Sequence, residues 1–321
     1  MKIIYNESLN AYFNIACEEY LLENFDEDIL YLYQNSPSII VGRNKTTHNE
    51  INFDIVKEQD IPIVRRLSGG GAVYQDIGNL NFCFIYRNVS KQKNDIEICT
   101  KPIIDFLHCI GVNAKFENEG NMTIGGMNFS KNSKYIRGKD ALLHGTLLYI
   151  SKLGDIAKFL KVSKKSSKQQ KKKITNISYH LPNFISINEF ISYMIEYLRE
   201  IYQDSHLYDL TNSDVKAINA LIETKYKTWE WNHENTPYYS YKKSIDTKDG
   251  NLQVSLSVKN GLIESLKFIG DFHRLKDLKP CEKLFINYPH NIEAIKELLK
   301  QHPAKDYFDE ITEAELMKVI F

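Results

Sequence analysis

The sequence predicts an α+β protein with one large and one small domain. Its 321 residues exceed the roughly 100–200 of an ordinary single domain. Strand-like and helix-like segments alternate irregularly, without the regular strand–helix repeat of a doubly wound fold. A polar, proline-bearing stretch up to about residue 241 then precedes a second group of segments. We therefore expect domains at residues 1–243 and 244–321.

The spacing of apolar residues predicts the elements of the large domain in order. A first helix begins after Ser8, which can cap it, and ends at the acidic residues 26–28. Short apolar runs rich in β-branched and aromatic residues predict buried strands. We expect strands at Ile29–Tyr33, Ser38–Val41, 61–64, 80–86 and 142–150, a covering helix at 103–110, and helices at 187–202 and 214–225.

The small domain is predicted to be α/β. Two alternating runs, residues 252–258 and 262–268, flank the dipeptide Asn260-Gly261. Asn-Gly between such runs is a strong hairpin signal, because both residues tolerate the positive φ of a tight turn. Helices at Ile292–Gln301 and 310–319 complete this domain.

The composition excludes several classes of protein. Apolar residues make up 43% and charged residues 26%, which is near the globular average and excludes a disordered chain. Lys plus Arg and Asp plus Glu number 41 each, so no net charge attracts nucleic acid. The lysine-rich residues 161–173 predict an exposed loop, and alternatively a patch or lid that meets an acidic partner.

The sequence also predicts the compartment. No apolar stretch resembles a signal peptide or is long enough to span a bilayer. Five cysteines without a CxxC pair indicate neither a disulfide framework nor a zinc site. We therefore expect a cytoplasmic protein.

Residues 65–79, RRLSGGGAVYQDIGN, carry the functional signal. Consecutive glycines let backbone N–H groups point into one concavity and let a ligand approach the main chain. Arg66 can add a bidentate contact to a phosphate or carboxylate. No Gly-Lys-Ser/Thr follows, so the loop is not a Walker A motif. The pattern predicts an anion-binding loop suited to an adenylate.

This segment resembles the RRxSGGGAVYHDxGN signature of the lipoate–protein ligases of the A type. Similar segments follow in order along nearly the whole chain, at residues 16–20, 37–42, 80–82, 144–147, 225–232 and 270–272. The resemblance implies a mixed-sheet large domain of the biotin/lipoate ligase kind and a small accessory domain. It also implies activation of lipoate to lipoyl-AMP with ATP and Mg²⁺, followed by transfer to a lysine of a lipoyl domain or a glycine-cleavage H-type protein.

The resemblance further implies the binding residues. In the family, the second arginine and the Gly-Ala-Val-Tyr stretch contact the nucleotide, and an apolar flank takes the lipoyl tail. His144 lies in an apolar strand, where a core histidine and a pocket residue are both compatible with the sequence. The implied substrate- and nucleotide-binding positions are Arg66, Ser68, Gly69, Gly70, Gly71, Ala72, Val73, Tyr74, Gln75, Asp76, Asn79 and His144.

Several positions depart from the family pattern. The family lysine that contacts the substrate carboxyl and the adenylate falls on Asn128. The arginine and aspartate of a GRND element fall on Glu119 and Asn121, and the histidine of an HD pair has become Gln75. Asn121 would be a weak metal ligand, through its carbonyl oxygen.

Lys131 is the cation nearest to Asn128 in the sequence and a possible substitute for the family lysine. Residues three apart in a strand point to opposite faces, so this substitution requires a turn, which we expect at residues 130–133.

These departures leave alternatives open. The first is an active ligase. The second is a non-catalytic or transfer-only homologue that binds lipoate, lipoyl-adenylate or a lipoylated partner. A cysteine-dependent acyl transferase is the poorer alternative, because Cys83 is predicted to be core and residues 116–133 contain no cysteine.

Overall fold

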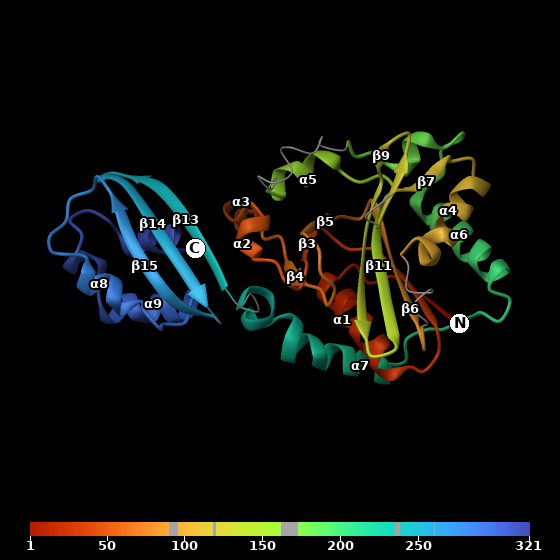
Figure 1. Cartoon of the computed structure of the whole chain (residues 1–321), viewed down its shortest axis with the longest axis horizontal. Coiled ribbons are helices and arrows are strands. Elements are labelled where there is room, and N and C mark those ends of the chain that lie inside the picture. Colours follow the sequence, from red (N-terminus) through yellow and green to blue (C-terminus); the bar gives the residue numbers. More distant parts are fainter. Residues whose placement is uncertain (90–95, 118–119, 162–172, 235–237, 260) are drawn as a thin grey trace. The chain divides into compact units, whose positions relative to one another are not determined.

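The computed structural model divides into two compact units, Met1–Thr228 and Trp229–Phe321. It describes residues 1–89, 96–117, 120–161, 173–234, 238–259 and 261–321 (Figure 1). The expected domain boundary after residue 243 falls inside β13 (Tyr238–Thr247), a strand of the second unit. The division therefore lies earlier than the sequence pattern suggests, because the polar stretch before residue 241 already contains part of a strand.

A six-stranded mixed sheet forms the centre of the first unit and confirms the predicted α+β class. The first three pairings across it are antiparallel and the last two are parallel. In spatial order its strands are β10 (Ser130–Arg137), β11 (Asp140–Leu148), β6 (Asn79–Tyr86), β2 (Ile29–Tyr33), β1 (Lys2–Asn6) and β12 (His206–Leu207).

The two faces of this sheet differ in chemistry, because successive strand residues point to opposite sides. Leu80, Phe82 and Phe84 of β6 join the main hydrophobic core with α4 (Ile96–Cys109) and α6 (Ile187–Ile201). Figure 1 shows these two helices on one side of the sheet and α1 with strands β3, β4 and β5 on the other. The second face is therefore covered by a different layer, which contains α1 and these three strands.

That layer consists of α1 (Ala11–Asn24) and a small sheet. In the small sheet β3 (Ser38–Val41) runs parallel to β4 (Ile63–Arg65) and antiparallel to β5 (Val73–Gln75). A separate apolar cluster joins it to two short helices, α3 (Phe53–Glu58) and α5 (Leu153–Phe159). The short helix α2 (Thr47–Glu50) ends just before Ile51, a buried member of this cluster.

A third sheet and further helices complete the first unit. Strands β7 (Ala114–Glu117), β8 (Asn121–Ile124) and β9 (Met127–Asn128) pair antiparallel. Helix α7 (Asn212–Leu221) continues into a π-helical turn, Ile222–Tyr226, and a second π-helical turn, Glu230–Glu234, begins the other unit.

The second unit contains an antiparallel three-stranded sheet of β13, β14 (Gly250–Lys259) and β15 (Leu262–Gly270). The predicted hairpin is confirmed: β14 and β15 pair, and Gly261 has a φ of +77°. Asn260 lies outside the described residues. Helices α8 (Lys279–Leu284), α9 (Ile292–Gln301) and α10 (Glu313–Ile320) complete this unit.

Other expectations need correction. Helix α1 is capped by Asn10 and not by Ser8: the Asn10 carboxamide accepts from the backbone N–H groups of Tyr12 (2.9 Å) and Phe13 (3.3 Å). Of the lysine-rich run, residues 162–172 lie outside the described part. No described helix combines the length and apolar character needed to cross a membrane.

Candidate functional site

Strand register on the second face of the large sheet brings the candidate residues together. Residues directly opposite each other in paired strands share a face. Lys131 lies opposite Thr146, and Thr146 lies opposite Asn81. Ser133 lies opposite His144, two residues further along the same pair of strands and therefore on the same face. Three distant segments therefore present polar side chains towards the small sheet.

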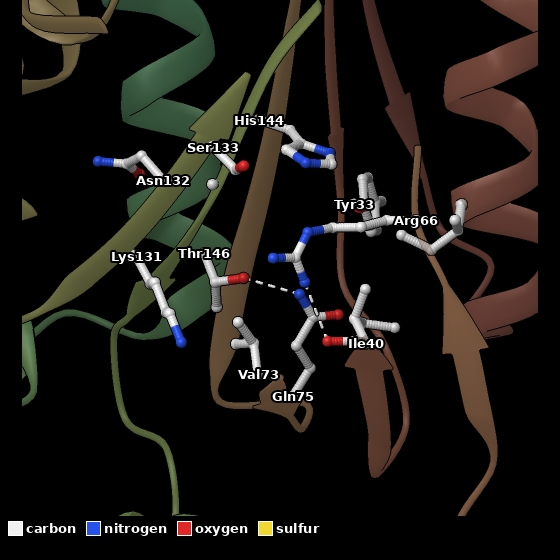
Figure 2. Close-up of a pocket in the computed structure, with 12 residues that line it drawn as sticks. Tyr33, Ile40, Arg66, Val73, Gln75, Lys131, Asn132, Ser133, His144 and Thr146 are labelled. Atoms are coloured by element: carbon white, nitrogen blue, oxygen red, sulfur yellow. Dashed lines mark hydrogen bonds between the residues drawn. The ribbon is translucent and has the colours of Figure 1, made fainter. Parts of the chain in front are cut away.

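Two adjoining pockets lie against this face. We name them after one lining residue each, and they share Val73, Lys131 and Thr146. The His144 pocket, shown in Figure 2, is lined by Ile15, Tyr33, Ile40, Arg66, Val73, Gln75, Lys131, Asn132, Ser133, His144, Gly145 and Thr146. The Asn128 pocket is lined by Ala72, Val73, Tyr74, Asn121, Asn128, Ser130, Lys131, Thr146, Leu148, Ile156, Leu160 and Ile174.

The Arg66 side chain supports the glycine loop through hydrogen bonds to its backbone. Burial lowers the pKa of its guanidinium to about 10, so it stays charged at neutral pH. The expected bidentate contact with an anion stays a prediction; in the structure, four N–H groups of the guanidinium bond the protein. They donate to Ser68 Oγ (3.0 Å) and to the carbonyl oxygens of Ile40 (3.0 Å), Gly69 (2.7 Å) and Gly71 (3.0 Å).

A hydrogen-bonded chain fixes the orientation of His144. Its Nδ1 lies 2.6 Å from Glu18 Oε2, and its Nε2 lies 2.5 Å from Ser68 Oγ. A carboxylate can only accept, so Nδ1 donates to Glu18, while Nε2 and the Ser68 hydroxyl share the second hydrogen bond. Tyr33 also donates to Glu18, at 3.0 Å. All four side chains are buried, and among them His144 and Tyr33 line the pocket.

Gln75, which replaces the family histidine, links the two sheets. Its Nε2 donates to Thr146 Oγ1 (2.7 Å) and its Oε1 accepts from Asn35 Nδ2 (2.7 Å). Thr146 in turn donates to Asn81 Oδ1 (2.8 Å). Both polar ends of the amide are therefore used, and Gln75 fixes one wall of the His144 pocket.

Asp76 and Asn79 have structural roles. The Asp76 carboxylate accepts from the backbone N–H groups of Gly78 (2.8 Å) and Lys152 (2.9 Å), and the Asn79 carboxamide accepts from the Ser151 hydroxyl. Neither is among the described residues that line the two pockets. These hydrogen bonds stabilise the turn between β5 and β6, and the nucleotide contact expected of the two residues stays a prediction.

Asn128 and Lys131 line the same pocket although they are three residues apart. Residues 130–133 are not the expected turn, because they begin strand β10. The chain changes sheets one step earlier: Asn128 ends β9, and Phe129 lies between β9 and β10. Leaving one sheet for the other removes the strict alternation that would have separated the two side chains.

The electrostatics around Lys131 are unusual for a lysine. Lys131 as a whole residue is exposed, whereas its ammonium group lies among protein atoms. Burial and the nearby Arg66 lower the pKa of Lys131 to about 8. Its Nζ donates to the carbonyl of Ala72 at 3.0 Å. By contrast, Asn128 Oδ1 is buried and has no hydrogen-bond partner in the structure.

Comparison with known proteins assigns the family. A model described as the lipoyl protein ligase A/B catalytic domain matches residues 10–199, and one described as the bacterial lipoate protein ligase C-terminus matches residues 236–320. The chain belongs to the lipoate–protein ligase family. It is 33% identical to lipoate-protein ligase LplJ of Bacillus subtilis and 34% identical to lipoate–protein ligase 1 of Staphylococcus aureus, over the full length of each pair.

Solved structures share the fold of this family member. One is the bi-partite lipoate protein ligase described with its E2 lipoyl domain from Thermoplasma acidophilum (TM-score 0.64, 23% identity, 72% of this chain and 95% of that chain). Another is lipoate-protein ligase A bound with ATP (TM-score 0.62, 24% identity, 72% of this chain and 97% of that chain). A third is P. falciparum LipL1 in complex with lipoate (TM-score 0.61, 23% identity), and this match covers 99% of each chain.

Cys83 is unsuited to the chemistry of a cysteine-dependent acyl transferase, the poorer of the alternatives that the sequence left open. It is fully buried, and burial together with the charge of Glu18 raises its pKa well above the usual value. The described residues that line the two pockets include no cysteine. The prediction that Cys83 is a core residue is confirmed.

We therefore expect Cys83→Ala to transfer the acyl group as fast as the native protein. In native protein the Cys83 thiol should resist iodoacetamide, whereas the exposed Cys109 thiol should react and serve as the positive control. Peptide mass spectrometry after alkylation measures both. Loss of transfer in a Cys83→Ala variant with an unchanged melting temperature would contradict this assignment.

The sequence did not single out three charged residues of the site: Glu18, Glu50 and Arg65. Glu18 and Glu50 lie in helices, where acidic residues usually face solvent. Only their long-range partners, His144 and Ala72, show that they are internal. Arg65 is the first arginine of the signature, but its side chain points away from the pockets and binds the loop at residues 42–47.

Proposed function

We propose that this chain is an ATP-dependent lipoate–protein ligase. It forms lipoyl-AMP and pyrophosphate from lipoate and ATP, and then transfers the lipoyl group to a lysine of a lipoyl domain or of a glycine-cleavage H-type protein. Its full-length relatives carry the name lipoate–protein ligase. The single structural observation that carries the proposal is the position of Lys131, whose side chain lines both pockets.

The chemistry of the two pockets supports an assignment of substrates. Ile15, Ile40 and Val73 give the His144 pocket an apolar wall between two sheets, which suits the hydrocarbon chain of lipoate. The Asn128 pocket combines the loop residues after Gly71 with aliphatic side chains such as Ile156 and Leu160, which suits a flat base and its ribose phosphate. The carboxyl and the α-phosphate would then meet at the junction.

Adenylation at that junction develops negative charge. A carboxylate oxygen of lipoate attacks the α-phosphorus of ATP, and the bond from that phosphorus to pyrophosphate breaks. A fixed cation beside the reacting oxygens stabilises this charge without reorganising. Lys131 supplies such a cation in this chain, in which an asparagine, Asn128, occupies the position of the family lysine. In the second step the acceptor amine attacks the acyl carbonyl, AMP leaves, and the amine loses a proton.

The residues present do not fit a resident magnesium site. Magnesium prefers carboxylate and phosphate oxygens, yet no carboxylate is among the described residues of the Asn128 pocket. Within the described ranges, no group of three or more His, Cys, Asp or Glu residues could hold a metal. We propose that magnesium enters as the complex with ATP. Asn121 lines the pocket, and its expected role as a weak metal ligand stays a prediction.

Measurement of pyrophosphate release tests the proposal. Purified protein with ATP and magnesium should release pyrophosphate only when lipoate is added, and an added lipoyl domain or H-type protein should gain one lipoyl group on a lysine. Premade lipoyl-AMP separates the alternatives. A transfer-only homologue would lipoylate the acceptor from lipoyl-AMP without releasing pyrophosphate from ATP, and a non-catalytic homologue would do neither.

A further inference from the structure

Glu50, at the end of α2, lies directly against the glycine loop. Its Oε2 accepts from the backbone N–H of Ala72 at 3.0 Å, while Lys131 donates to the carbonyl of the same residue at 3.0 Å. A Cβ at position 71 would lie 2.8 Å from Glu50 Oε2 and 3.4 Å from Lys131 Nζ. Glycine at this position therefore allows a carboxylate and an ammonium to approach one point of the loop.

The backbone around Glu50 is held in place. Its carbonyl accepts from the backbone N–H of Lys161 at 2.9 Å, and the next residue, Ile51, is fully buried and forms a β-bridge with Leu160. On the solvent side, Lys45 Nζ lies 3.3 Å from Glu50 Oε1. The Glu50 side chain is only 20% exposed, so its carboxylate is a fixed feature of the site and not a mobile surface charge.

We propose that Glu50 is a positioning residue for Lys131: it holds the Gly71–Ala72 segment of the loop and places a negative charge near the Lys131 ammonium at the junction of the two pockets. The catalytic consequence rests on the proposed adenylation, but the electrostatic relation between the two side chains does not. Neither a phosphate nor a carboxylate need be bound for Glu50 to act on Lys131.

The charges around Lys131 show why such a partner is needed. After burial, the largest influence is Arg66 from the loop after β4, which disfavours a second cation. Lys45, from the loop before α2, acts in the same direction. Glu50 is the group that opposes them and raises the Lys131 pKa. Because the built Cβ of residue 71 would lie 2.8 Å from Glu50 Oε2 and 3.4 Å from Lys131 Nζ, these two atoms are no more than about 6 Å apart, within the range over which opposite charges shift a pKa.

The test is Glu50→Gln, which keeps an acceptor for the Ala72 N–H group and removes the charge. Titration of lysine ¹³Cε signals by NMR, with Lys131 assigned from Lys131→Arg, measures its pKa without any turnover. We expect the Lys131 midpoint to fall by about one pH unit in Glu50→Gln. The alkaline fall of kcat/KM for pyrophosphate release should move to lower pH by the same amount.

Glu223→Gln is the matched control, because it removes a carboxylate that pairs with Lys227 at 2.7 Å elsewhere on the chain. It should leave the Lys131 titration unchanged. A Lys131 midpoint in Glu50→Gln that equals or exceeds the native one would overturn the proposal. A native protein that releases no pyrophosphate would contradict the proposed function instead, and the NMR titration would still decide the role of Glu50.

Discussion

Lys131→Met is expected to lower lipoate-dependent pyrophosphate release by about 10²–10³-fold, the usual loss when one preorganised electrostatic donor is removed. The methionine keeps most of the aliphatic stem, so the pocket keeps its wall and loses its charge. The Nζ of Lys131 also bonds the Ala72 carbonyl, and part of the loss will come from a looser loop. Initial rates with ATP and lipoate varied separately measure the effect on kcat and on each KM.

Restoring the charge from a different position is the sharper control. Asn128 lines the same pocket and has an unpartnered carboxamide oxygen, so a lysine there can reach the same space. Adding Asn128→Lys to the Lys131→Met variant should therefore recover part of the lost rate. Full activity in the single Lys131→Met variant would show that adenylation does not use this cation.

The pH dependence gives an independent check. A lysine is charged below its pKa, and burial with Arg66 lowers the Lys131 pKa to about 8. If the charged form is the active one, kcat/KM for ATP is at its plateau well below pH 8 and falls as the pH rises through that value. Lys131→Arg keeps a charge throughout this range, so its profile should stay flat over the same interval.

Local sequence patterns predicted much of the fold. The strands Ile29–Tyr33 and Ser38–Val41 were predicted with their observed bounds, because short apolar runs between polar residues have few alternatives. The helix Ile292–Gln301 was likewise predicted with its observed bounds. The first residue of α4 was misplaced by seven positions, since its N-terminal turn has no clear apolar periodicity before residue 103.

The site was predicted less completely, because its decisive features are long-range. The sequence identified Lys131 as a possible substitute for the family lysine, but it placed the turn at residues 130–133, which begin strand β10. The actual change of direction at Phe129 depends on two partners that local pattern does not reveal: Asn128 pairs with Thr123 in one sheet, and Ser130 pairs with Leu147 in another. The burial of Glu18 and Glu50 depends on the same kind of distant pairing.

Arg65→Met is expected to destabilise the first unit by about 3 kcal/mol or more, since each buried acceptor left unsatisfied costs about 1–3 kcal/mol. The Arg65 side chain is fully buried, and burial lowers its pKa to about 10, so it is charged at neutral pH. Its guanidinium donates to the carbonyl oxygens of Gly42 (2.9 Å), Arg43 (3.0 Å) and Lys45 (2.8 Å) and to Thr47 Oγ1 (3.0 Å).

Urea unfolding followed by two probes measures this effect, because the chain has only two tryptophans, Trp229 and Trp231, and both belong to the second unit. The circular dichroism transition should move to lower urea in Arg65→Met, and the tryptophan fluorescence transition should move less. Arg137→Met is the control: this arginine is half exposed, and its ion pair with Glu23 is 3.4 Å long, so little stability should be lost.

The same substitution links stability to binding. The loop that Arg65 holds runs directly into α2, which ends at Glu50, and Glu50 holds the Gly71–Ala72 segment of the glycine loop. Without urea, where the protein is folded, Arg65→Met should therefore raise the KM for ATP. Arg137→Met should leave that KM unchanged. An Arg65→Met protein with native stability and native KM would show that the first arginine of the signature does not support the loop.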